Sequence, residues 1–224
     1  ISLFALASIL ILSRMKETLP KAMKSHFSLS LFRIGWKDVF EPKVIPVFWV
    51  MLFVSFSAGA MITLIPDTSK VVGWTNKGLY FTIYTISSIV IRFFFSKASD
   101  QYGRIPVLIF GSFMLSLSMF LLVFSANSYL LISSAVIYGI AWGFNTPTLA
   151  AWTNDLGDKN HMGRAMATMY IALEAGIGIG AYISGEIYQG VASQIPIPFL
   201  LAALLALLAF LLLWTKKRNW TYGI

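Results

Sequence analysis

Cysteine is absent from this 224-residue chain, histidine occurs only twice, and acidic residues are scarce, nine against 17 Lys and Arg. Without cysteine, thiols say nothing of the redox compartment. Both histidines, His26 and His161, lie in links between apolar runs, and no G-x-S-x-G sequence occurs. A membrane enzyme needs nucleophiles, metal ligands or paired carboxylates that converge. These absences argue against an enzyme, and we predict neither a cofactor nor a metal site.

Long apolar runs dominate what is present. Hydrophobic residues make up 58% of the chain, charged residues 12%, and the mean hydropathy is +0.77. A bilayer span needs roughly 20 mostly apolar residues. Six runs are long enough: Pro46–Ile65, Gly78–Phe95, Pro106–Ala126, Tyr129–Trp152, Ala165–Ile187 and Pro198–Trp214. The sequence therefore predicts an all-α integral membrane protein that crosses the bilayer repeatedly.

The first residues form a seventh apolar run, residues 1–13, which is too short to cross. Because the chain opens on Ile1 inside this run, we expect a truncated transmembrane helix whose preceding part is missing. Residues 14–45 are then a cytoplasmic linker between domains, basic and interspersed with apolar residues, as in a helix at the headgroup boundary. Residues 46–215 form the six-helix domain, and 216–224 a cytoplasmic tail.

The net charge of +8 reflects topology rather than nucleic-acid binding. If the six runs cross in succession, all basic residues except Lys70 and Lys77 fall on one side. Cytoplasmic loops carry such an excess of Lys and Arg. We expect the linker and the C-terminus in the cytoplasm, in a plasma membrane such as the bacterial inner membrane. No nucleic-acid partner is predicted.

The runs differ in polarity. Phe199–Leu213 contains only Leu, Ala and Phe and is expected to face lipid. Tyr129–Trp152 is rich in Ser, Thr, Gly and Asn, and its Gly143 and Pro147 are expected to weaken the helix. Polar groups at membrane depth need protein or water partners. The candidates for a substrate cavity are Phe56 in the first run and Tyr138, Trp142 and Asn145 in this one.

Glu174 lies about 14 Å into the helix that is expected to start near Ala165, close to mid-bilayer. A carboxylate at that depth is costly and suggests ion or substrate handling, here the exchange of a proton. The alternative is a structural Glu bonded to neighbouring helices. Gly176 and Gly180 follow as a GxxxG pair, which permits close helix packing and would equally serve a sliding interface.

A nine-residue link, 96–104, separates two membrane-length runs and contains Asp100, Gly103 and Arg104. So short a charged turn is expected in a moving, gated helix bundle rather than in a plain anchor. Arg92 precedes it at the end of its helix, where it would either snorkel to the surface or pair with Asp100.

The link also resembles a known signature. Residues 92–106 read R-F-F-F-S-K-A-S-D-Q-Y-G-R-I-P, similar to the G-x-x-x-D-R-x-G-R-R loop of the major facilitator superfamily. Ser96, Gln101 and Ile105 depart from that pattern. Further resemblances are to the end of helix six and to helices ten and eleven of twelve-helix drug-efflux members: Glu17-Thr18-Leu19, Tyr138 to Pro147, Gly163-Arg164-Ala165 and Glu174 to Gly180.

The resemblance implies the end of helix six followed by helices seven to twelve, the C-terminal half of a transporter without its N-terminal half. Helices seven and ten would line the cavity, eight and eleven would meet the other half, and nine and twelve would face lipid. Asp100 would latch onto the opposite half, with Gly103, Arg104 and Arg92 as its gating neighbours.

The sequence thus predicts a secondary transporter that moves a small organic solute with protons, by rocking between two states, with export preferred. The glycines from Gly176 to Gly180 echo the efflux signature of helix five, although Ala181 stands where a proline is usual. Uptake of a metabolite stays open, as does a non-transporting scaffold or receptor. A scaffold would have no need of a mid-membrane Glu beside a polar helix.

Overall fold

The computed structural model describes residues 39–124 and 127–221, together with Ser8, Arg14 and Gly35 as single positions. The expected helix end at 1–13, except Ser8, and most of the linker lie outside the described residues. Contacts divide the chain into residues 1–35 and 36–224, and every element below belongs to the second unit.

The second unit is built of helices, and none of its described residues forms a strand. This confirms the predicted all-α membrane fold, because one helix covers each of the six apolar runs. In chain order the elements are η3 (Pro42–Val44), α3 (Ile45–Val71), α4 (Leu79–Phe94), α5 (Ala98–Gln101), α6 (Arg104–Val123), α7 (Ser128–Leu156), α8 (Met162–Tyr188), η4 (Ala192–Gln194) and α9 (Pro196–Thr221).

Five of these helices are long and apolar enough to cross a membrane. Of the six helices that follow the apolar runs, only α4 falls short: it has 16 residues and is about 24 Å long, against a hydrocarbon core of roughly 30 Å. Helices α3 and α9 exceed their predicted spans by the most. Helix α3 continues past the predicted end at Ile65 and contains Pro66, and α9 continues to Thr221.

Helix α7 is continuous through Pro147, although the sequence suggested a weak point there. Proline cannot donate the backbone hydrogen bond to the carbonyl four residues earlier. Neighbouring helices hold such segments straight in membranes. Here Gly139 and Gly143, two turns and one turn before Pro147, let α7 approach the backbone of α4 near Ser88.

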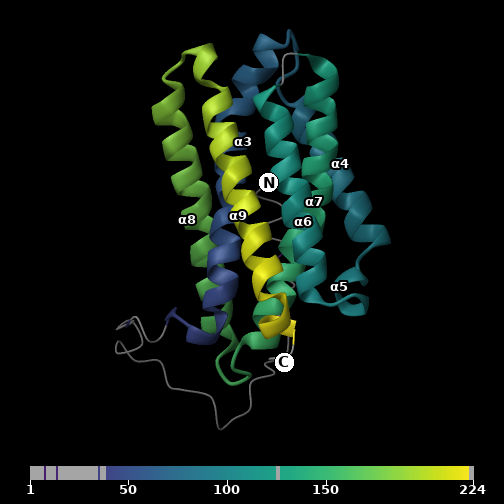
Figure 1. Ribbon diagram of the computed structural model, residues 1–224, viewed down its shortest axis with the longest axis vertical. Coiled ribbons are helices and arrows are strands. Elements are labelled where there is room, and N and C mark those ends of the chain that lie inside the picture. The colour runs from purple at the N-terminus through teal and green to yellow at the C-terminus, as the bar shows by residue number, and fades with distance from the viewer. Residues whose placement is uncertain (1–7, 9–13, 15–34, 36–38, 125–126, 222–224) are drawn as a thin grey trace. The chain divides into compact units, whose positions relative to one another are not determined.

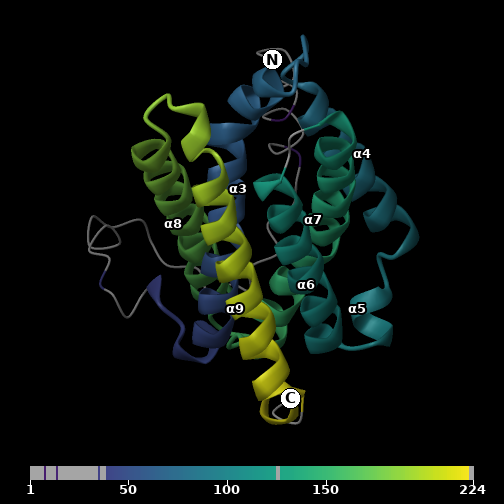
Figure 2. The same cartoon turned by 45° about the horizontal axis from the view of Figure 1, so that its top comes forward.

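The helices contact one another in the order α8, α3, α9, α6, α7 and α4, so that α8 and α4 are the two outer members (Figure 1). The view in Figure 2 keeps α8 and α4 at opposite edges of the bundle. Helix α3 is the most buried, with 67% of its span inside, whereas only 28% of the α8 span is covered. The outer helices therefore retain broad faces that nothing in this bundle covers.

Glycine sets the distance between α3 and α8. A Cβ at Gly176 would lie 2.6 Å from the backbone oxygen of Leu52, and one at Gly180 would overlap the backbone of Phe56. From the other side, a Cβ at Gly59 would run into the backbone of α8 at Ile177. The two helix backbones are in direct contact, and the pair Gly176 and Gly180 lies at the centre of that contact.

This contact predicts opposite effects for two neighbouring glycines. Gly176→Ala should destabilise the protein by about 1–3 kcal/mol, because the added methyl overlaps the α3 backbone. Gly178→Ala meets nothing within 4 Å and should gain about 0.5–1 kcal/mol, since alanine favours a helix. Thermal unfolding of the purified full-length variants in detergent measures both. Equal melting temperatures for the two variants would contradict the close α3–α8 packing.

Candidate functional site

Arg104 joins three elements at the end of the bundle where α5 lies. Its Nε donates to Oδ2 of Asp155 at 2.7 Å, and its Nη1 donates to the Ser99 hydroxyl at 2.8 Å. Nη1 also pairs with the carboxylate of Asp100, one turn earlier in sequence. Gly103, with φ of +87°, forms the turn that brings α5 and the start of α6 together. Three of the predicted gating residues, Asp100, Gly103 and Arg104, thus lie in one cluster.

The expected pairing of Arg92 with Asp100 is not found. Within the part of the chain that the structure describes, Arg92 has no carboxylate within 4.0 Å, and Asp100 pairs with Arg104 instead. The expectation assumed one continuous helical turn from Arg92 to Asp100. The helix ends at Phe94, and a new turn begins at Ala98, so the helical phase is lost between them. Arg92 instead lines a cavity next to α7.

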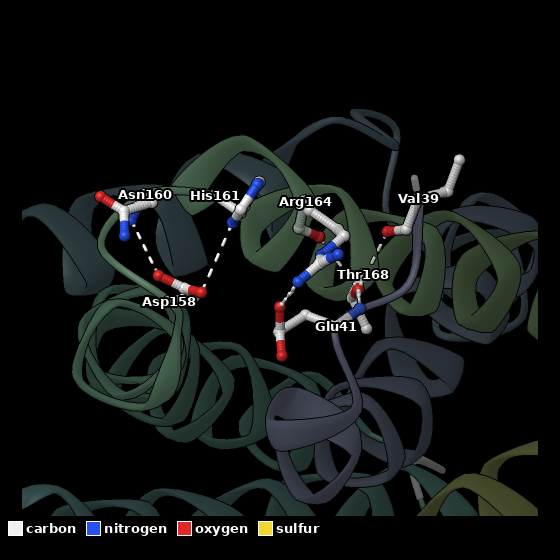
Figure 3. Close-up of polar contacts among 7 residues, drawn as sticks. All are labelled: Val39, Glu41, Asp158, Asn160, His161, Arg164 and Thr168. Atoms are coloured by element: carbon white, nitrogen blue, oxygen red, sulfur yellow. Dashed lines mark hydrogen bonds and ion pairs between the residues drawn. The ribbon is translucent and has the colours of Figure 1, made fainter. Parts of the chain in front are cut away.

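A second ion pair ties the residues before α3 to α8 (Figure 3). Arg164 donates to Oε2 of Glu41 through Nε at 3.0 Å and through Nη2 at 2.5 Å. Only 4% of the Glu41 side chain is exposed. Thr168, one turn along α8, accepts a hydrogen bond from the Glu41 backbone N–H at 2.8 Å, and its hydroxyl lies 3.1 Å from the Val39 carbonyl.

The turn between α7 and α8 carries a third, exposed set of contacts, also drawn in Figure 3. Asp158 accepts from the backbone N–H of Asn160 at 2.9 Å and faces the His161 ring at 3.4 Å. The Asn160 bond, then the His161 contact, lower the pKa of the Asp158 carboxyl. These contacts lie at the exposed surface of the turn that precedes Arg164.

Glu174 lies near the middle of α8 and is exposed, on the side turned away from α3. Residues four apart on this face are also exposed: Tyr170, Gly178, Tyr182 and Glu186. Gly176 and Gly180 face α3, as their contacts show. One side of α8 is therefore small and packed, and the other carries two carboxylates and two tyrosines.

Three of the four predicted cavity residues are buried inside the bundle: Phe56, Tyr138 and Asn145. Trp142 is half-buried and stacks on Tyr138, with ring centroids 5.9 Å apart and an interplanar angle of 11°. Tyr84 meets Tyr138 edge-on at 5.4 Å. Both amide atoms of Asn145 lack a hydrogen-bond partner among the described residues, and Gly111 of α6 leaves room for them.

Comparison with known proteins identifies the family. The sequence profile of the Major Facilitator Superfamily matches residues 75–219. This chain belongs to the Major Facilitator Superfamily. The family is one of membrane transporters rather than enzymes, and this chain is accordingly a multi-pass membrane protein.

Several relatives of this superfamily match over most of the chain. Multidrug resistance protein 2 of Bacillus subtilis is 25% identical over 77% of this chain and 44% of its own length. Quinolone resistance protein NorA of Staphylococcus aureus is 26% identical over 81% of this chain and 48% of its own. An uncharacterized transporter of this superfamily from Methanocaldococcus jannaschii is 24% identical over 77% and 45%. The chain spans about half the length of each of these relatives.

Sequence reasoning missed Asp155, Ser99, Glu41 and Thr168. Arg104 and Asp155 are 51 positions apart, and Glu41 and Arg164 are 123 apart. No short-range spacing in the sequence indicates that residues so far apart along the chain will pair. One usable signal was the rarity of acidic residues, because each of the nine needs water or a polar partner in a membrane protein. The sequence shows that Glu41 lies directly before one apolar run and that Asp155 lies at the end of another.

The Glu41–Arg164 pair makes a stability prediction. Arg164→Gln should cost about 3–5 kcal/mol, since it leaves a buried carboxylate without its cation. Adding Glu41→Gln should recover part of that loss, because the uncompensated charge is gone. Thermal unfolding of the full-length protein measures both effects.

Asp158→Asn is the matched control, because Asp158 lies in the exposed turn just before Arg164. This substitution should leave the melting temperature unchanged. An Arg164→Gln variant as stable as this control would show that the buried pair contributes nothing.

Proposed function

We propose that this chain is the C-terminal half of a proton-coupled transporter that exports small organic solutes by alternating access. The observation that carries the proposal is Glu174, an exposed carboxylate near the middle of a membrane-spanning helix in a superfamily of transporters. A charge at this depth is maintained where it faces a water-filled path or the protein interior.

Two observations support a missing N-terminal half of the same protein as the partner. The chain spans about half the length of its relatives. Helix α8 also leaves a broad face uncovered, and this face carries Glu174 and Glu186. Carboxylates turned to lipid would be costly, whereas a facing protein half and an aqueous path between the halves would solvate them.

Export is favoured over uptake by the names of the relatives. The relatives named multidrug resistance protein and quinolone resistance protein match over 77% and 81% of this chain. The substrate that we propose is therefore a drug-like, partly apolar organic molecule. Membership of the superfamily makes a non-transporting scaffold the weaker alternative.

In the proposed cycle, Trp142 contacts the solute and Tyr138 supports it from behind. The two rings are stacked, and only Trp142 is partly exposed. Phe56 and Asn145 are packed inside the bundle and would act by shaping the wall rather than by contact. An aromatic ring offers a large apolar surface that does not require a particular hydrogen-bonding group on the solute, which suits a carrier of varied solutes.

Asp100, Gly103 and Arg104 form the proposed latch at the cytoplasmic face. The Asp100 side chain is 62% exposed, while the Arg104 side chain that holds it is 19% exposed. Asp100 is thus oriented by Arg104, which also donates to Ser99, and its side chain is largely exposed. A cation or a helix N-terminus of the N-terminal half would pair with it in one of the two states.

Glu174→Gln tests proton coupling. The full-length protein is reconstituted into proteoliposomes with a pH difference of one unit, and accumulation of a fluorescent quinolone is followed. One proton per solute supports about tenfold accumulation across such a gradient. We expect Glu174→Gln to abolish this accumulation while exchange of quinolone across the membrane, which needs no net proton movement, persists.

Glu186→Gln is the matched control, because Glu186 lies on the same face of α8 at its far end. It should keep the driven accumulation. Accumulation by Glu174→Gln that equals that of Glu186→Gln would rule out Glu174 as the coupling residue.

A further inference from the structure

A cavity of about 210 Å³ lies where the end of α4 and the short helix α5 meet α7. It is separate from the residues proposed to contact the solute or the proton. Its lining combines one cation, three hydroxyl side chains and two aromatic rings: Arg92, Ser96, Ser99, Thr148, Phe95 and Phe144. No carboxylate belongs to that lining. The composition suits an anion with an apolar portion.

The cation in this cavity has no ion-pair partner among the described residues, unlike its neighbours. Arg104 pairs with Asp100 and Asp155, and Arg164 pairs with Glu41. Arg92 has no Asp or Glu within 4.0 Å. Its guanidinium carries five N–H donors in a planar fork that matches the oxygens of a phosphate.

Three hydroxyl groups add donors around the same space. Ser99 accepts a hydrogen bond from Arg104 at 2.8 Å, so its own O–H proton is free to point elsewhere. Ser96 and Thr148 also line the cavity, and no hydrogen bond of their side chains is found in the described part of the chain. Both hydroxyls are therefore available to an acceptor that enters the cavity.

The surroundings of the cavity point to a lipid as the carrier of that acceptor. Arg92 lies in the last turn of α4, at the edge of the membrane-spanning part. The next three residues are phenylalanines that are 78%, 70% and 53% exposed, and the last of them, Phe95, also lines the cavity. Basic pockets between transmembrane helices on the cytoplasmic side bind anionic headgroups.

We propose that this cavity binds the phosphate of an anionic phospholipid, held by Arg92 and the hydroxyls of Ser96, Ser99 and Thr148. The acyl chains lie along Phe93, Phe94 and Phe95. This assignment depends on the geometry and on the superfamily, and it holds whichever solute is carried and whether or not protons are coupled.

The test is a lipid titration of the full-length protein, followed by native mass spectrometry. Phosphatidylglycerol, phosphatidylcholine and inorganic phosphate are added in separate arms. Wild-type protein should retain phosphatidylglycerol in preference to phosphatidylcholine. Arg92→Gln should weaken phosphatidylglycerol binding about tenfold, as expected for losing hydrogen bonds to a charged group. Thr148→Val, which keeps the shape and removes the hydroxyl, should weaken it about threefold.

Lys97→Gln is the matched control, since it removes one exposed positive charge from the same link without lining the cavity. It should change the affinity by less than about twofold. Equal losses for Arg92→Gln and Lys97→Gln, or none for either, would overturn the proposal. So would binding of inorganic phosphate at the site without binding of phosphatidylglycerol, because the anion would then come from solution.

Discussion

The contact between α3 and α8 is the constraint on which the rest of this bundle depends. In lipid, apolar surface gives helices little reason to associate, so close van der Waals packing must hold them together. Gly59, Gly176 and Gly180 bring the two backbones into direct contact, and the buried Glu41–Arg164 pair fixes one end. The small residues of α8 face α3, and its larger and charged residues, Glu174 among them, lie on the opposite side.

The same principle recurs at the other edge of the bundle. Gly139 and Gly143 of α7 admit the backbone of α4, and Gly111 of α6 admits the Asn145 side chain. The ion pairs between helices lie at the helix ends. There Arg104 joins α5, α6 and α7 through Ser99, Asp100 and Asp155. Close packing at glycines thus holds the interior of the bundle together, and ion pairs hold the end where α5 lies.

Much of this arrangement was readable in the sequence, because it depends on local pattern. Six apolar runs predicted six helices to within a few residues at most ends, and the motif of Asp100, Gly103 and Arg104 predicted a polar turn. What failed depended on tertiary context. Helix α7 continues unbroken through Pro147 and packs closely on α4 just before it, and Arg92 misses Asp100 because the helix stops between them. Asn145 and Phe56 look available in sequence, yet neighbouring helices cover them.

These features together separate what is fixed in the bundle from what is free to change partner. The α3–α8 and α4–α7 contacts run backbone against backbone, and such packing has few alternative arrangements. The exposed carboxylates Asp100 and Glu174 lie on no such contact. In the proposed cycle, this division would let the packing survive the motion while the polar contacts outside it are made and broken.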